Sequence, residues 1–151
     1  MTYEELLLEA EDNGLIVREK PLKAYRGRIK GNRIAIKADM TIDEKVCVLS
    51  EELGHYYTTV GNILNLSDVR NSKQEQQARF WAYNKQIGLL GIVQAFENRC
   101  KNLHEMAEYL NVTEEFLLDA LTCYKSKYGV SVKIDNYIIY FEPCLQIVKF
   151  L

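Results

Sequence analysis

Residues 41–59 read TIDEKVCVLSEELGHYYTT, and this stretch determines the centre of the fold. It opens with the spacing of a capping box, in which the Thr41 side chain caps a helix and Glu44 returns a hydrogen bond. Apolar residues then recur at helical spacing, at Ile42, Val46, Leu49 and Leu53. The pattern predicts an amphipathic helix that buries this face and ends near Thr59, before Gly61.

The middle of this helix carries polar residues that could bind a metal. Glu51 and His55 lie four residues apart, so their side chains rise from one face about one turn apart, while Glu52 lies roughly 100° further round. This is the spacing of the zincin motif His-Glu-x-x-His, with Glu51 at the position of the first histidine. Tyr56 and Tyr57 follow, and either could contribute a hydroxyl that stabilises an oxyanion. Acidic residues are also common on helix surfaces, so this short motif leaves a structural role open.

A β-hairpin is predicted before this helix. Between residues 26 and 37, two alternating segments flank Gly31-Asn32, which is a favourable two-residue turn. Residues 18–37 hold eight Lys or Arg and a single acid, Glu19, so one face of the sheet should be positive. A solvated face that protects an edge strand from foreign pairing is the simpler interpretation. Binding of an acidic partner or of nucleic acid is the alternative.

A further helix is predicted from Lys73 to Gln86, after a polar loop over residues 65–71. The sequence EQQARFWA begins at Glu75, in the first turn of this helix. Its inward positions are Ala78, Trp81 and Ala82.

Together, the hairpin, the capped helix and the following helix resemble the ImmA/IrrE family of metallopeptidases. In that family a zincin helix follows a small antiparallel sheet, and a downstream helix of the form Glu-x-x-Ala-x-x-aromatic-Ala supplies the third metal ligand. The downstream helix of this chain matches that form at Glu75, Ala78, Trp81 and Ala82. The resemblance covers about residues 15–128, and Gly54-His55 and the Glu75 helix are its most specific parts. The prophage members of the family are the closest in length.

The resemblance implies roles for four residues. His55 and Glu75 would be metal ligands, Glu51 would stand in the first-ligand position, and Glu52 would be the general base that deprotonates the attacking water. The implied cofactor is Zn²⁺. The implied substrate is a helix-turn-helix repressor of a phage or mobile element, or a related regulator, so that the protein would act as a prophage antirepressor.

A glutamate at position 51 changes the electrostatics of such a site. Two histidines and one glutamate around Zn²⁺ leave a net positive charge, whereas Glu51, His55 and Glu75 neutralise the ion. The bound water should then be less acidic than the usual catalytic value, which is about 7. We therefore expect slower catalysis at neutral pH and a weaker preference for Zn²⁺ over Mn²⁺ or Fe²⁺.

The second histidine has the same spacing in different surroundings. His104 and Glu108 lie four residues apart, but the apolar residues around them place both on the polar face of a helix. Residues 104–119 have the rhythm of a helix-turn-helix, yet they hold five acids and no Lys or Arg, and such a surface would repel phosphates. We interpret this segment as a packing or protein-contact face, not as a metal site or a DNA reader.

The rest of the chain completes an α+β, zincin-like prediction. Helices are expected over 3–12, 103–110 and 114–124, a short strand over 15–17, and a terminal hairpin over 130–141 before Pro143. The predicted fold is a mainly helical body with a small antiparallel sheet and a C-terminal β-hairpin.

Composition limits the class of protein. The chain has 151 residues, 48% hydrophobic and 26% charged, with a net charge of -2, and we expect one globular domain over residues 1–151. No apolar run is long enough to span a bilayer, the N-terminus lacks a signal-peptide pattern, and the four cysteines are scattered singly. We therefore expect a cytoplasmic protein with reduced thiols and without membrane contact. The net charge gives no overall attraction to nucleic acid, and we expect no direct binding of nucleic acid.

Three functions remain as hypotheses. The first is a metal-dependent endopeptidase of the zincin type that cleaves a repressor-type regulator. The second is a catalytically impaired relative, with its metal site degraded at Glu51, that binds a regulatory protein without cleaving it. The third, a nucleic-acid-binding module, would use the basic hairpin.

Overall fold

The computed structural model describes residues 1–59 and 72–150, and it is an α+β fold, as predicted. The chain divides into two compact units, Met1–Lys85 and Gln86–Leu151. The expectation of a single domain stays a prediction. No helix among the described residues is long and apolar enough to cross a membrane. The four cysteines carry free thiols.

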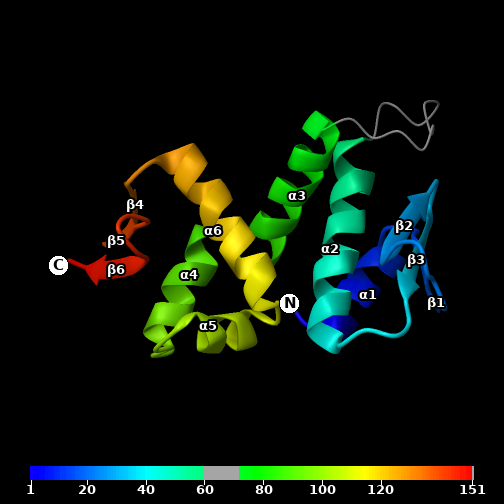
Figure 1. Cartoon of the computed structure of the whole chain (residues 1–151), viewed down its shortest axis with the longest axis horizontal. Coiled ribbons are helices and arrows are strands. Elements are labelled where there is room, and N and C mark those ends of the chain that lie inside the picture. The colour runs from blue at the N-terminus through cyan, green and yellow to red at the C-terminus, as the bar shows by residue number, and fades with distance from the viewer. Residues whose placement is uncertain (60–71, 151) are drawn as a thin grey trace. The chain divides into compact units, whose positions relative to one another are not determined.

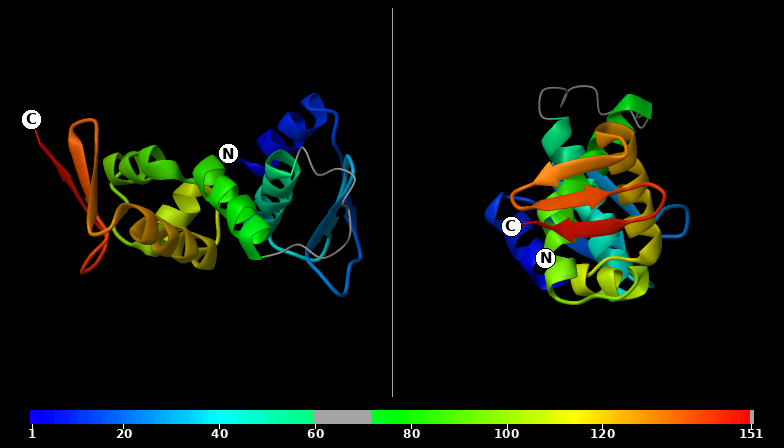
Figure 2. Two further views of the ribbon diagram at one scale, coloured as in Figure 1. Left: turned by 90° about the horizontal axis from the view of Figure 1, so that it is seen from above. Right: turned by 90° about the vertical axis from the view of Figure 1, so that its left-hand side faces the viewer.

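The first unit holds the basic hairpin and the helix that carries Glu51 and His55. Its elements are α1 (Tyr3–Asp12), β1 (Ile16–Lys20), β2 (Gly27–Lys30), β3 (Arg33–Lys37), α2 (Ile42–Thr58) and α3 (Ser72–Gln86, of which Gln86 begins the second unit). In Figures 1 and 2, α2 lies between the sheet on one side and α3 on the other. The polar loop predicted over residues 65–71 lies outside the described residues.

Helix α2 begins as its sequence predicts. The Thr41 hydroxyl accepts a hydrogen bond from the Glu44 amide and the Glu44 carboxylate accepts one from the Thr41 amide, each at 3.2 Å. This capping box satisfies donors that have no partner within the helix. Ile42 differs from the prediction, because its side chain is 55% exposed. It occupies the first helical position, one turn before Val46, and is not part of the core cluster that the rest of the apolar face joins.

The sheet of the first unit has the order β1-β3-β2. Strands β2 and β3 form the predicted antiparallel hairpin around Gly31-Asn32. Strand β1 pairs with β3 in parallel, from Ile16 opposite Arg33 to Lys20 opposite Lys37, so the sheet is mixed rather than wholly antiparallel. The reason is the strand order: the tight hairpin turn brings β3 back between β1 and β2, where it runs in the direction of β1.

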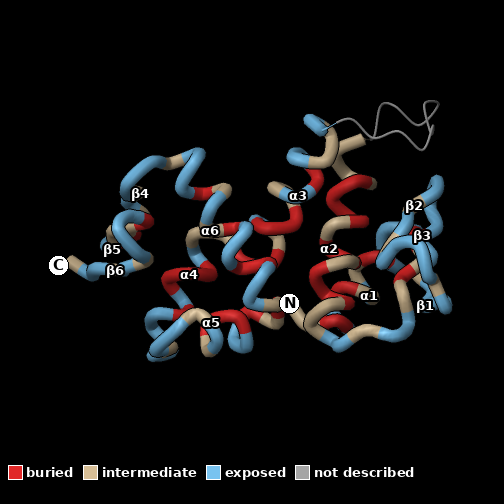
Figure 3. The backbone as a smooth tube through the Cα atoms, in the orientation of Figure 1, coloured by how far each residue is buried: buried red, intermediate tan, exposed pale blue. Residues whose placement is uncertain are grey.

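The core of the first unit lies between the inner face of this sheet and helices α1 and α2. Its most buried members are Leu6, Ala10, Ile34, Ile36, Val46, Leu49 and Leu53. Figure 3 shows the resulting line of buried positions along α2. This packing fixes the rotation of α2, and with it the directions in which the polar side chains of the helix point.

The second unit is built from three helices and a separate sheet. Its elements are α4 (Gly88–Glu97), α5 (Leu103–Leu110), α6 (Glu114–Tyr128), β4 (Ser131–Ile134), β5 (Tyr137–Tyr140) and β6 (Gln146–Lys149). Strands β4 and β5 form the predicted terminal hairpin. Strand β6, which follows Pro143, adds an antiparallel third strand that the sequence did not indicate (Figure 2). It is an edge strand of four residues, which is too short to show a clear alternation of apolar and polar residues in the sequence.

Candidate functional site

The structure brings His55 of α2 and Glu75 of α3 together. The His55 Nε2 atom lies 3.3 Å from Glu75 Oε1, although the two residues come from different helices. The histidine side chain is 5% exposed and the glutamate side chain 36% exposed. The pair therefore has a buried nitrogen donor and a carboxylate that solvent can reach.

The two helices can meet at this point because residue 54 is a glycine. A Cβ atom built on Gly54 would lie 2.3 Å from the carbonyl oxygen of Ala78, far inside any normal contact distance. Ala78 is itself fully buried. The backbones of α2 and α3 are thus in direct contact beside His55 and Glu75, and small residues on both sides permit it. This explains in physical terms why Gly54 precedes the histidine and why an alanine follows Glu75 by three residues.

The distance between the two side chains suits a shared cation. Zn–N and Zn–O bonds of about 2.0–2.1 Å in a tetrahedral site place neighbouring donor atoms roughly 3.3–3.4 Å apart. The observed 3.3 Å between His55 Nε2 and Glu75 Oε1 agrees with that value. It is longer than the usual N–H···O hydrogen bond, which is about 2.9–3.0 Å. The donor atoms and their spacing therefore fit a divalent cation.

Glu51 is the predicted third ligand. It lies on α2, one turn before His55, and is partly exposed. Within residues 1–59 and 72–150, however, no group of three or more His, Cys, Asp and Glu side chains is arranged to hold a metal ion. The role of Glu51 as a ligand consequently stays a prediction, and His55 and Glu75 are the two site residues that the structure brings together.

Glu52, the predicted general base, lies under the edge strand of the sheet. Its side chain is buried, at 6% exposure. A Cβ atom built on Gly27 of β2 would lie 3.3 Å from Glu52 Oε1 and 2.5 Å from Cγ1 of Val48. The glycine thus gives the Glu52 carboxylate its space beside the strand. Gly27 was not among the site residues predicted from the sequence, although a glycine inside an alternating strand is a signal of close approach.

Arg79 contacts the outer oxygen of Glu75. Its Nε atom lies 4.0 Å from Glu75 Oε2, and the two residues are four apart on α3. Both side chains are partly exposed, so the ion pair contributes little to stability. It does favour the orientation in which Oε1 of Glu75 points toward His55.

Three aromatic side chains pack beside the site. The ring of Tyr57 stacks on Trp81 of α3, with centroids 5.1 Å apart, and Tyr56 meets Tyr57 edge to face at 5.2 Å. Burial raises the pKa of Tyr57 above its ordinary value, and the negative charge of Glu9 adds to the effect. Tyr56, Tyr57 and Trp81 all pack against the core cluster of the first unit, so the two tyrosines have a packing role.

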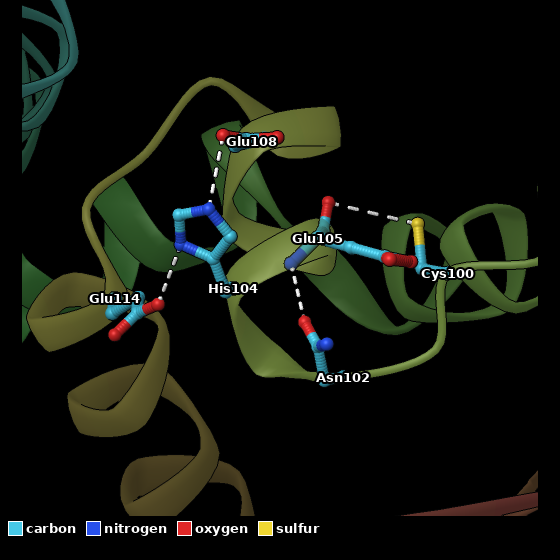
Figure 4. A network of polar contacts seen from close by, with 6 residues as sticks. All are labelled: Cys100, Asn102, His104, Glu105, Glu108 and Glu114. Carbon is cyan, nitrogen blue, oxygen red and sulfur yellow. Dashed lines mark hydrogen bonds and ion pairs between the residues drawn. The ribbon is translucent and has the colours of Figure 1, made fainter.

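His104 lies in the second unit in a different kind of environment. Its Nδ1 atom lies 2.8 Å from a carboxylate oxygen of Glu114 and its Nε2 atom 3.1 Å from one of Glu108 (Figure 4). The hydrogen bond to Glu114, followed by the charge of Glu108, raises the pKa of His104. The two carboxylates approach opposite sides of the ring, so they cannot join one ring nitrogen around an ion. His104 and Glu108 are neighbours on the polar face, as the sequence suggested, and Glu114 is a contact that sequence spacing could not indicate.

One of three comparisons with known proteins found a match. Residues 10–122 match a peptidase family model, Peptidase_M78, described as the IrrE N-terminal-like domain. The match includes both α2 and α3 and therefore His55 and Glu75. No curated protein and no solved structure matches the chain.

Proposed function

Because this chain belongs to the IrrE N-terminal-like family of peptidases, we propose that it is a metal-dependent endopeptidase with its cation held by His55, Glu75 and Glu51. The family is of the metallopeptidase type, and the observation that supports the assignment of residues is the 3.3 Å approach of His55 to Glu75. The cation is Zn²⁺, or Mn²⁺ or Fe²⁺ because two of the three donors are carboxylates. When bound, it would polarise the scissile carbonyl and lower the pKa of the attacking water.

Glu52 has the position of a proton acceptor in this proposal. Glu52 lies between the proposed ligands Glu51 and His55 in the sequence of α2, and its side chain is buried under β2 at Gly27. A carboxylate in such surroundings can take a proton from water and return it to the leaving amine. Tyr56 or Tyr57, which follow His55 on α2, would donate a hydroxyl to the developing oxyanion.

The substrate we propose is an extended segment of a regulatory protein. Strand β2 forms an edge of the described sheet and passes over Glu52. An extended peptide that pairs with this edge would bring its backbone carbonyls to the buried carboxylate. The family resemblance makes a helix-turn-helix repressor of a phage or mobile element the best candidate, with the protein acting in the cytoplasm as a prophage antirepressor.

One observation favours a second candidate function. Since the described residues contain no complete group of three metal ligands, Glu51 could mark a degraded site. The protein would then bind its regulator without cleaving it.

Co-expression with the helix-turn-helix regulator encoded nearest to the gene distinguishes the two functions. We expect fragments of the regulator with the wild type and none with Glu52→Gln, which removes the proton acceptor and leaves His55 and Glu75 in place. His104→Ala, which changes the other histidine of the chain, is the matched control and should cleave normally. Cleavage that persists in Glu52→Gln would contradict the mechanism, because loss of a general base typically costs about 10²–10⁴-fold in rate. Stable co-purification of the intact regulator with the wild type would support the second function.

A further inference from the structure

The outer face of the sheet in the first unit is densely basic. Side chains alternate between the two faces of each strand, and every outward position of β1, β2 and β3 except two carries a positive charge. The charged residues on this basic face are Arg18, Lys20, Arg28, Lys30, Arg33 and Lys37. The register sets them in cross-strand rows, such as Arg18, Ala35 and Arg28. Neighbouring rows are two residues apart, which is about 6.6–6.8 Å.

The acid in these strands does not offset the charge of the basic face. Glu19 is the one acid in β1, β2 and β3, and its carboxylate accepts hydrogen bonds from Tyr3 Oη at 3.0 Å and from Lys45 Nζ at 2.8 Å. Both partners come from helices on the inner side of the sheet. The pKa of Glu19 is lowered by the Lys45 contact, so this carboxylate is ionised and engaged on the side away from the basic face.

The centre of the basic face is hollow and partly apolar. Ala35 lies between Arg18 and Arg28 in the register, and the surface here holds an open depression of about 650 Å³ whose rim carries the cationic side chains. Its apolar lining includes Ile16. At the border, Arg28 Nη1 donates a hydrogen bond to Tyr25 Oη at 3.3 Å, and its guanidinium lies 5.5 Å from the centre of that ring. The Tyr25 ring remains 41% exposed.

We propose that the basic face binds a single-stranded nucleic acid. Cations in repeated rows complement a polymer that carries a phosphate at every nucleotide, and the apolar depression with an exposed tyrosine can receive unstacked bases. A duplex presents chiefly phosphates and sugars, so it would leave the apolar floor unused. A solvated face that only protects edge strands would require neither the depression nor the aromatic ring.

The chain's net charge of -2 does not oppose this binding. Charges act over a Debye length, about 8 Å at physiological ionic strength, so a strand on the basic face meets the local cations and not the average of the chain. The basic face is also separate from the proposed peptidase site. Glu52 lies against Gly27 on the inner side of the sheet, opposite to Arg28 and Lys30. The proposal therefore does not depend on the proposed peptidase function.

Fluorescence anisotropy with the full chain and a labelled oligodeoxythymidine of about 15 nucleotides tests the proposal. If the six cations contact phosphates, the logarithm of the binding constant should fall with the logarithm of salt concentration with a slope of about -4. Affinity should then drop about 300-fold between roughly 50 and 200 mM salt. A duplex of the same length and a polyglutamate peptide serve as competitors. No binding at low salt, or tighter binding of either competitor, would overturn the proposal.

Two sets of variants separate the basic face from general charge. The triple variant Arg18→Gln, Lys30→Gln and Arg33→Gln should reduce the slope to about -2 and weaken binding at low salt by at least about tenfold. The control triple variant Lys101→Gln, Lys127→Gln and Lys133→Gln removes the same charge from the second unit and should bind like the wild type. Equal effects of the two triple variants would overturn the proposal.

A tyrosine pair tests the contact with bases. Tyr25→Ser should weaken binding about tenfold without changing the salt slope, because stacking is lost and phosphate contacts remain. Tyr109→Ser is the control, since that ring is equally exposed, at 42%, but lies in the second unit. Thermal unfolding of each variant shows whether it is folded. A folded Tyr25→Ser variant with wild-type affinity would contradict the proposed base contact.

Discussion

Gly54→Ala should separate His55 from Glu75. The added Cβ would lie 2.3 Å from the Ala78 carbonyl oxygen, and an ordinary contact begins at 3.4 Å, so α2 and α3 must move apart by about 1 Å. Alanine gains about 0.8–1.0 kcal/mol of helix propensity over glycine, whereas overpacking typically costs about 1–3 kcal/mol. We expect a net destabilisation of up to about 2 kcal/mol. This corresponds to a fall in Tm of up to roughly 8 °C for a chain of this size.

The effect of this substitution on metal binding should exceed its effect on stability. A shift of this size removes the 3.3 Å approach of His55 to Glu75, and disturbed support of metal ligands typically weakens affinity about 10–100-fold. Gly91→Ala is the matched control, because a Cβ at that helical glycine would meet side-chain carbons of Leu110 and Ile87 at the ordinary distances of 3.4 and 4.0 Å. Isothermal titration with Zn²⁺ and thermal unfolding would be measured on both variants. A Gly54→Ala protein with wild-type Tm and affinity would refute the close-packing explanation.

Three further predictions concern single side chains. Glu51→His should tighten Zn²⁺ binding in isothermal titration, because neutral imidazole restores a net positive charge to the site; equal or weaker affinity would show that residue 51 is not a ligand. Gly27→Ala should slow cleavage of the regulator by about tenfold or more while Zn²⁺ binding persists, because the new Cβ would lie 2.5 Å from Val48 Cγ1 and 3.3 Å from Glu52 Oε1 and so displace both side chains; unchanged cleavage would argue against a role for that carboxylate. The pKa of His104 is raised in the folded state, first by the hydrogen bond to Glu114, so the protonated histidine stabilises the fold. This stabilisation should be complete below the unfolded-state pKa of about 6.5 and should disappear as pH rises through the higher folded-state pKa. A Tm difference between wild type and His104→Ala that does not shrink as pH rises through this window would contradict the prediction.

The sequence predicted the elements that local physics determines. The capping box at Thr41 and the alternation on both sides of Gly31-Asn32 gave α2 and the hairpin, because caps and tight turns depend on residues close in the chain. The resemblance of the Glu75 helix to the family motif predicted that Glu75 and His55 share one site, and in the structure Glu75 Oε1 lies 3.3 Å from His55 Nε2.

Features that depend on contacts between distant segments of the chain could not be predicted from the sequence pattern. The parallel pairing of β1 with β3 follows from strand order, which alternation does not encode. The roles of Gly27 and Gly54 come from what their missing side chains would touch in another element. The contact of Glu114 with His104 joins two helices across a turn. Ile42 fits the apolar face by spacing, but its exposure depends on where the core ends.

Metal content tests most directly whether His55 and Glu75 form a metal site. Untagged wild-type protein, His55→Ala and His104→Ala would be incubated with Zn²⁺, desalted and analysed by mass spectrometry of the elements. The geometry predicts about one equivalent of metal in the wild type and in His104→Ala, and none in His55→Ala, because His55 approaches Glu75 whereas His104 is paired with Glu108 and Glu114. A metal-free wild type, or equal metal content in His55→Ala and His104→Ala, would contradict it.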